Sequence, residues 1–99
     1  MTIKDLRTKK LYAREMVSGI PKDVQKVALR KLRVLDSARY LNDLRVPPTN
    51  KLSRLLGRRQ GQYNIRIDDE WRLCFEWHQC HAHNVEVVNY QKESGGKKA

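Results

Sequence analysis

The sequence contains few of the residues that mark exported, membrane-spanning or disulfide-bonded proteins. Its two cysteines, Cys74 and Cys80, are too few for a disulfide framework. No apolar run approaches the roughly 20 residues that a membrane-spanning helix needs, and the first ten residues contain no hydrophobic signal core. We therefore expect a protein of the reducing cytoplasm that has no membrane partner.

Signatures of several catalytic classes are also missing. The chain has no Gly-x-Ser-x-Gly elbow, no glycine-rich phosphate loop and no pair of carboxylates at helical spacing. Residue types that ligate metals gather in one segment, without a second pair elsewhere: Cys74, His78, Cys80, His81 and His83. Because zinc ligands usually come from two separated pairs, we interpret these residues as an ordinary polar loop and expect no metal and no other cofactor.

Acidic residues are scarce in the first part of the chain. Residues 1–60 carry 16 Lys and Arg against 5 Asp and Glu, whereas residues 61–99 carry 5 against 6. A positive field of this kind attracts polyanions, so nucleic acid is the expected partner. An acidic protein partner is the alternative, because charge steers association without specifying what binds.

The first part of the chain predicts helices. Apolar residues at helical spacing predict one helix over residues 8–17 and a second over 22–38, which begins just after Pro21. A short edge strand over 2–6 precedes them, and residues 40–45 add one helical turn. The two helices are expected to form a hairpin that is basic outside and apolar inside.

The second part of the chain predicts strands. Two prolines predict an extended segment over residues 45–50. Side chains alternate over 62–67 and again over 71–77, and a long loop over 78–84 leads to a last strand over 85–90. The connections are a strand or turn over 51–56, a loop over 57–61 and an acidic turn over 68–70.

This order of elements predicts an α+β fold in one domain over residues 1–91, with a disordered basic tail over 92–99. The N-terminal helical hairpin packs on one face of a small, mainly antiparallel sheet. The residues of that face expected to bury the helices are Tyr63, Ile65, Leu73, Phe75 and Val87. The opposite face, with Arg66, Arg72 and Glu76, is left for water or a ligand.

The position of Arg72 suggests a function. A charge in the middle of a sheet is costly without a partner, and Tyr90 is expected at a comparable level on the next strand. Arginine and tyrosine together can clamp a phosphate and can stack on or protonate part of an RNA chain. Further basic residues crowd the approach to the sheet and are candidate RNA contacts, although a solvated basic surface is the alternative: Lys51, Arg54, Arg58, Arg59 and Arg66.

The run "LRVPPTNKLSRLLGRRQGQYNIRIDDEWRLCFEW", followed by "VEVVNYQ", resembles the HigB branch of the RelE/ParE superfamily, the toxins of type II toxin–antitoxin modules. The resemblance covers residues 3–91 and implies a helical hairpin on a twisted sheet. It also implies a metal-independent endoribonuclease that cleaves mRNA in the A site of the 70S ribosome. Arg72 matches the strand arginine that would bind the scissile phosphate in this family.

The last strand departs from the family pattern. Relatives commonly end this strand with Asp-Tyr-His, whereas this chain has Asn89, Tyr90 and Gln91, and Ser53 stands where some relatives place a histidine. Asparagine keeps hydrogen bonding but loses the charge, and glutamine cannot exchange protons as histidine does. Three interpretations remain open: a slow nuclease, an inactive one, and a protein that acts mostly through its antitoxin.

The resemblance also implies partners. The usual antitoxin is a small helix-turn-helix (HigA-like) protein, and the toxin–antitoxin complex binds its own promoter DNA. Because this chain is so basic, we expect an acidic contact surface on the antitoxin, or contacts remote from the active face. Two alternatives involve no cleavage: a gyrase poison that acts by protein contact, and an RNA-binding module.

Overall fold

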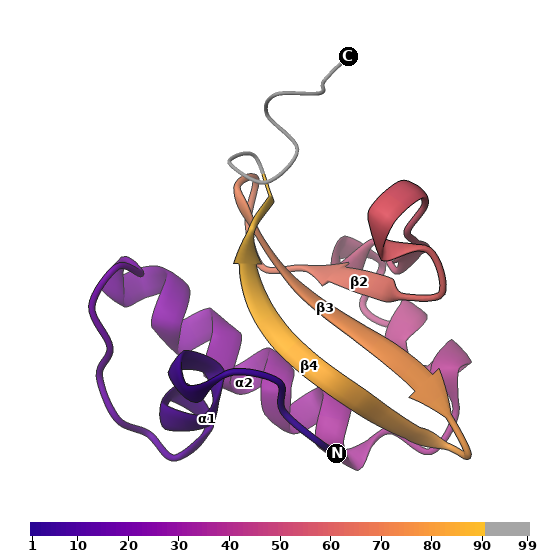
Figure 1. The fold of residues 1–99 in the computed structure, drawn as a ribbon, viewed down its shortest axis with the longest axis horizontal. Coiled ribbons are helices and arrows are strands. Elements are labelled where there is room, and N and C mark those ends of the chain that lie inside the picture. Colours follow the sequence, from indigo (N-terminus) through magenta and orange to yellow (C-terminus); the bar gives the residue numbers. More distant parts are fainter. Residues whose placement is uncertain (91–99) are drawn as a thin grey trace.

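The computed structural model describes residues 1–90, in which two helices precede a four-stranded antiparallel sheet (Figure 1). The helices are α1 (Leu6–Tyr12) and α2 (Lys22–Ser37), and the strands are β1 (Ser53–Arg54), β2 (Tyr63–Arg66), β3 (Trp71–His78) and β4 (His81–Asn89). Strand order follows chain order, and β3 and β4 form a long curved hairpin. The predicted α+β fold is therefore confirmed. Gln91 and the predicted tail over 92–99 lie outside the described residues.

Helix α2 lies where the sequence predicts it and ends one residue earlier. Its apolar residues Val24, Ala28, Leu32 and Leu35 recur at helical spacing, and each is at most 4% exposed. This face packs against β3 and β4. Because burying a side chain of this kind contributes about 1.5–3 kcal/mol, the packing face explains why the helix forms here. No helix within the described residues is long and apolar enough to cross a membrane.

The first helix begins and ends earlier than predicted. It starts at Leu6, directly after the extended residue Asp5, and it stops before Arg14, whose φ of 69° is left-handed. The expected edge strand over 2–6 is reduced to an isolated parallel bridge between Ile3 and Val85. Met16 marked the predicted helix over 8–17, but it lies beyond the helix and is 63% exposed.

The proline segment is only partly extended. Val46 and Pro47 are extended, but Pro48–Asn50 forms a 3-10 turn, because proline is tolerated in the first turn of a helix. The fully buried Asn50 organises this turn: its amide donates to the carbonyls of Leu44 and Val46, and it accepts a hydrogen bond from Lys31 on α2. Burial lowers the pKa of Lys31, and the neighbouring positive charge of Arg30 lowers it further. The expected helical turn over 40–45 is confirmed by a 3-10 helix over Leu41–Arg45.

The hairpin between β3 and β4 is much tighter than predicted. Instead of a loop over 78–84, two residues make the turn, Gln79 and Cys80, with φ of 53° and 65°. Two left-handed residues match the twist of a tight hairpin, but Asn and Gly are the residues that usually signal such a turn. The sequence therefore predicts a loop for the histidine-rich segment, whereas in the structure His81 begins β4.

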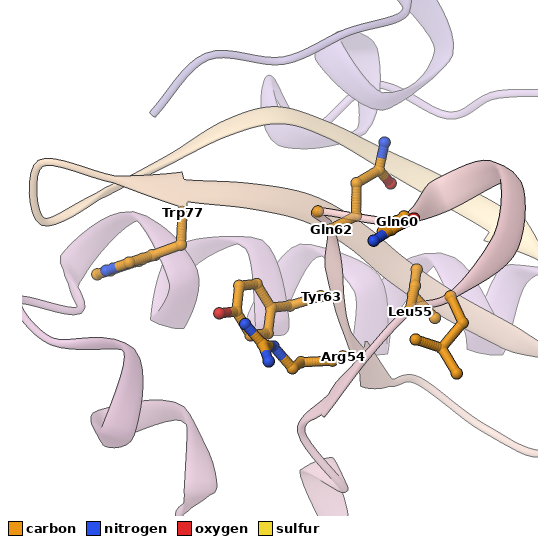
Figure 2. Close-up of a pocket in the computed structure, with 8 residues that line it drawn as sticks. Arg54, Leu55, Gln60, Gln62, Tyr63 and Trp77 are labelled. Carbon is orange, nitrogen blue, oxygen red and sulfur yellow. The ribbon is translucent and has the colours of Figure 1, made fainter.

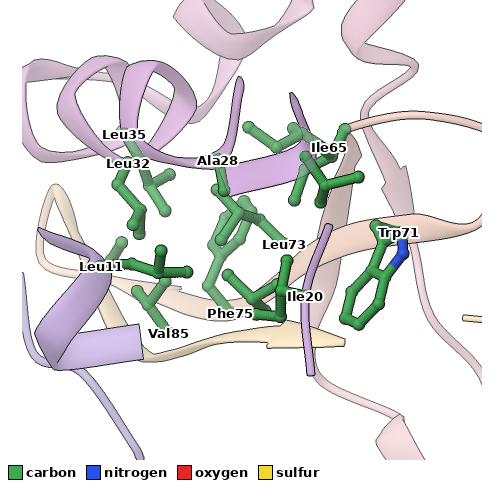
Figure 3. Close-up of a cluster of buried hydrophobic side chains, with 14 of the residues drawn as sticks. Leu11, Ile20, Ala28, Leu32, Leu35, Ile65, Trp71, Leu73, Phe75 and Val85 are labelled. Carbon is green, nitrogen blue, oxygen red and sulfur yellow. The ribbon is translucent and has the colours of Figure 1, made fainter. Parts of the chain in front are cut away.

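The main core lies between the helices and one face of the sheet (Figure 3). Its buried members come from both layers and include Leu11, Ile20, Ala28, Leu32, Leu35, Ile65, Trp71, Leu73, Phe75 and Val85. The opposite face was predicted to be open, and this is only partly correct. Leu55, beyond β1, packs there with Cys74 and Val88, and Tyr90 lies against this second cluster. The β1 segment therefore covers part of the face that carries Arg72.

Candidate functional site

Arg72 is the second residue of the inner strand β3, near one end of the sheet, where it pairs with Arg66 on β2 and Val88 on β4. Its side chain is half-buried, and its guanidinium carbon lies 5.1 Å from the centre of the Tyr90 ring. The predicted proximity of Arg72 and Tyr90 is thus confirmed. The Nε atom of Arg72 is buried without a hydrogen-bond acceptor among residues 1–90. A buried unpaired donor is unfavourable, so this guanidinium is suited to bind an anion such as phosphate.

A buried asparagine orients Arg72. Asn64 Oδ1 accepts a hydrogen bond from Arg72 Nη1 at 3.1 Å, and Asn64 Nδ2 donates to Ser53 Oγ at 3.0 Å. Asn64 is 2% exposed, and it pairs with Ser53 on β1 and Cys74 on β3. A polar chain therefore crosses three strands and ends at the guanidinium. Sequence reasoning missed this role for Asn64, and its only signal was a short amide in the alternating strand.

The acidic turn between β2 and β3 holds the end of β4. The Glu70 carbonyl accepts a hydrogen bond from the Tyr90 amide at 2.7 Å, and its carboxylate accepts one from Asn89 Nδ2 at 3.1 Å. These contacts bring Asn89 and Tyr90 to the same end of the sheet as Arg72. Sequence reasoning treated Glu70 only as a turn residue, although a carboxylate two positions before Arg72 is a signal. Gln91, the remaining candidate, lies outside the described residues.

The five basic residues expected to contact RNA do not form one cluster. Arg59 is 18% exposed and donates to Gln62 and Glu86 at 3.0 and 3.1 Å. Arg66 pairs with Asp69. The guanidinium of Arg54 lies 5.9 Å from the centre of the Tyr63 ring, a residue on the helix-facing side of the sheet (Figure 2). Lys51 and Arg58 have exposed side chains, so these two and Arg54 remain accessible to a polyanion.

The histidines lie at the opposite end of the hairpin from Arg72. His78 ends β3, and His81 and His83 lie in β4, with the His78 and His83 rings 4.7 Å apart. His83, the nearest of the three to Arg72, pairs with Glu76, which lies four positions along β3 from Arg72, roughly 13 Å at 3.3 Å per residue. No histidine of this group therefore reaches the Arg72 site. Within residues 1–90, no three His, Cys, Asp or Glu side chains converge in a way that would hold a metal ion.

The Arg72 end of the sheet combines groups that suit phosphate chemistry. It offers a guanidinium, the Tyr90 phenol, the Asn89 amide and the Glu70 carboxylate. A guanidinium can bind a phosphate and stabilise negative charge on it, and a phenol or carboxylate can transfer protons. The geometry therefore supports binding of a phosphodiester and proton transfer close to it.

Comparison with known proteins identifies the family. The model of the RelE-like toxins of type II toxin–antitoxin systems, HigB, matches residues 2–91. Toxin HigB-1 of Vibrio cholerae serotype O1 is 40% identical over 58 residues, which cover 59% of this chain and 61% of that protein. An uncharacterized protein of Haemophilus influenzae is 34% identical over 68 residues, which cover 69% of this chain and 67% of that protein.

The match thus spans less than two thirds of the Vibrio cholerae protein, whereas the family model covers nearly the whole of this chain. The predicted resemblance is confirmed, and the helical hairpin, the sheet and the strand arginine all lie within the matched residues. The chain belongs to the HigB-like family of RelE-like toxins of type II toxin–antitoxin systems.

Proposed function

We propose that this toxin is a ribosome-dependent endoribonuclease that cleaves mRNA in the ribosomal A site without a metal ion or another cofactor. One observation carries the proposal: the half-buried Arg72 has a buried Nε without an acceptor in the described residues, and it lies over the Tyr90 ring. A guanidinium prepared in this way favours a phosphate whose charge increases during the reaction. Family membership supports the same activity.

The proposed reaction is an intramolecular transfer at phosphorus. The 2′-hydroxyl attacks the adjacent phosphorus, and the bond from that phosphorus to the 5′-oxygen of the next nucleotide breaks. A base accepts the proton of the 2′-hydroxyl, and an acid donates a proton to the departing 5′-oxygen. The products are a 2′,3′-cyclic phosphate and a free 5′-hydroxyl, so neither water nor an oxidant is consumed.

Each residue of the site has an assigned role. Arg72 binds the scissile phosphate and stabilises the phosphorane, and Tyr90 is the proton-transfer group beside it. Asn89 and Gln91 form hydrogen bonds to phosphate or base, and Glu70 offers the carboxylate that Asn89 lacks. A phenol transfers protons less readily near neutral pH than an imidazole. We therefore expect a slow nuclease.

The partners follow from the family and the charge. A type II toxin has an antitoxin partner. We propose a helix-turn-helix antitoxin of the HigA-like kind with an acidic contact surface, and a toxin–antitoxin complex through which promoter DNA is bound. For the free toxin, we propose that basic residues contact the phosphates of mRNA and of the 70S ribosome: Lys51, Arg54, Arg58, Arg59 and Arg66.

Primer extension on a defined mRNA in a translating extract tests this function. We expect discrete cuts within codons that require ribosomes and disappear in Arg72→Ala and Tyr90→Phe. Arg39→Ala is the matched control, because it removes an exposed arginine that lies beside Cys80 and His81 at the hairpin tip, away from Arg72. Cuts that persist in Arg72→Ala would contradict the assigned role.

An Asn89→Asp/Gln91→His variant separates the remaining interpretations. Cuts from this variant alone would mean that the scaffold is a toxin whose acid–base groups have been lost. If neither protein cuts mRNA, the function is non-enzymatic, and inhibition of DNA gyrase or RNA binding without cleavage becomes the better explanation.

A further inference from the structure

A second site lies near the β1 edge of the sheet, on a surface that the proposed reaction does not use. A cavity of about 280 Å³ is lined there by Arg54, Tyr63 and Trp77, which come from three adjacent strands, and by the loop that contains Gln60 (Figure 2). Arg54 pairs directly with Tyr63, whose strand partner Phe75 lies two residues before Trp77. The sheet register therefore places one cation and two aromatic rings around a single cavity.

The two rings of this cavity are supported from the core. The Tyr63 ring stacks on the fully buried Phe75, with ring centres 6.1 Å apart and planes 26° from parallel. Trp77 is half-buried and packs at the edge of the same core. Figure 2 shows both rings projecting on the same side of their strands, with the Arg54 guanidinium against Tyr63. Flat surfaces held in this way lose little conformational entropy when a ligand stacks on them.

The lining of the cavity carries positive charge and no negative charge. None of its residues is acidic, and Arg54 supplies a cation. The side-chain amides of Gln60 and Gln62 add groups that can both donate and accept hydrogen bonds. Drug-sized ligand sites usually measure about 300–1,000 Å³, so this cavity suits one small flat group rather than a folded segment.

We propose that this cavity binds a single unpaired RNA base, which stacks on Trp77 while Arg54 contacts the base or its phosphate. Every base presents a π face to an aromatic ring, and arginine planes also stack on bases. An acidic peptide would use Arg54, but it would gain little from two supported rings. The inference rests on the proposed function for the nature of the ligand, and it assigns Trp77 to RNA binding rather than to cleavage.

Fluorescence anisotropy of a labelled, unstructured RNA tests the proposal directly. The same ribose-phosphate chain without bases is the matched ligand, since it keeps the charge and removes the stacking groups. We expect Trp77→Ala to weaken binding of the intact RNA by roughly tenfold and to leave binding of the abasic chain unchanged. Trp77→Phe should retain most of the affinity, because phenylalanine also stacks on bases.

Two control variants separate stacking from charge and from general surface changes. Tyr40→Ala removes an aromatic side chain that is 62% exposed and does not line the cavity, so it should not change either affinity. Arg58→Ala removes an exposed charge and should weaken both ligands equally. Equal affinities of Trp77→Ala and the parent for intact RNA would overturn the proposal. Competition with polyglutamate gives a second such outcome. If polyglutamate displaces the RNA from the parent protein but not from Trp77→Ala, the cavity binds an acidic peptide and the proposal is overturned.

Ribosome binding distinguishes the source of the base. Weaker sedimentation of Trp77→Ala with 70S ribosomes that are free of mRNA would assign the base to ribosomal RNA. A loss that occurs only with mRNA-loaded ribosomes would assign it to the message. The cleavage assay is independent of these results: absence of cuts with intact Trp77-dependent RNA binding would refute the nuclease but keep the cavity. Normal cuts with Trp77-independent RNA binding would refute the cavity alone.

Discussion

The two faces of the sheet are built from the same alternating strands, but they are closed by different means. On the helix-facing side, Ile65, Leu73 and Phe75 are fully buried under apolar side chains. On the opposite side, Asn64 is just as well buried, but its contacts are hydrogen bonds to Ser53 and Arg72. The first face therefore contributes mainly to stability, whereas the second fixes the orientation of the Arg72 guanidinium.

The largest expected effect is on the apolar face. Phe75→Ala leaves a cavity beneath the helices and should lower the free energy of unfolding by about 3–5 kcal/mol. Arg72→Ala, three positions earlier on the same strand and on its opposite face, should change it by less than about 1 kcal/mol because its side chain is half-exposed. Urea denaturation of the two variants measures both values. Equal losses would remove the distinction between the faces.

The next largest effect is on the cleavage rate, where the substitution of Arg72 is expected to be severe although it changes stability little. Arg72→Ala should reduce the cleavage rate by about 10²–10³-fold, the usual consequence of losing a donor to a developing oxyanion. Arg72→Lys should recover little of this, because an ammonium cannot use the planar fork that Asn64 holds. Single-turnover cleavage on programmed ribosomes gives the rates. Full activity of Arg72→Lys would show that charge alone is sufficient.

The apolar face was the easier of the two to predict. The period of α2 and the alternation of β2 and β3 follow directly from where Leu32, Leu73 and Phe75 stand, because burial of apolar area dominates their placement. The tight turn at Gln79 and Cys80 could not be read in this way. Neither residue is one that commonly adopts a left-handed conformation, and the turn is imposed by strand pairing on both sides.

The polar face could be predicted only in part. The proximity of Arg72 and Tyr90 follows from alternation and strand order, and the structure confirms it. The link from Arg72 through Asn64 to Ser53 depends on the register of β1, which is only two residues long. The contact of Glu70 with Asn89 depends on the shape of a turn. Side-chain hydrogen bonds of this kind have no period in the sequence, so they become visible only in the folded chain.

A smaller effect concerns the end of β4. Asn89 donates to the Glu70 carboxylate, which a carboxylate at position 89 could not do. Asn89→Asp should therefore lower the free energy of unfolding by about 1 kcal/mol at neutral pH, through a lost hydrogen bond and like-charge repulsion. Adding Glu70→Gln should restore it, because the glutamine amide can donate to aspartate. Thermal unfolding of the single and double variants measures the coupling.

The contact between Glu70 and residue 89 also bears on the variant Asn89→Asp/Gln91→His, which is designed to restore activity. In Asn89→Asp/Gln91→His, Glu70 repels the new aspartate and should displace it from its site. We expect Asn89→Asp/Gln91→His/Glu70→Gln to cleave faster than the double variant, since a well-placed acid–base group contributes about 10²-fold or more. Equal rates would mean that Glu70 does not position residue 89 during cleavage.

The smallest effect lies in the helical layer and separates folding from chemistry. The Tyr12 hydroxyl donates a hydrogen bond to Asp36, and this bond, with burial and the Asp36 charge, raises the pKa of Tyr12. A raised pKa in the folded state means that the stabilisation is present below the ordinary tyrosine value of about 10 and is lost as the pH rises through the folded value.

Tyr12→Phe should lower the free energy of unfolding at neutral pH by no more than about 1 kcal/mol. Between neutral and alkaline pH, its free energy of unfolding should fall less than that of the parent. Tyr12 belongs to the helical layer, on the other side of the sheet from Arg72. Tyr12→Phe should therefore leave the pH profile of cleavage unchanged, whereas Tyr90→Phe should alter or abolish it. A change in that profile in Tyr12→Phe would mean that alkaline inactivation reflects loss of folding and not titration on the polar face.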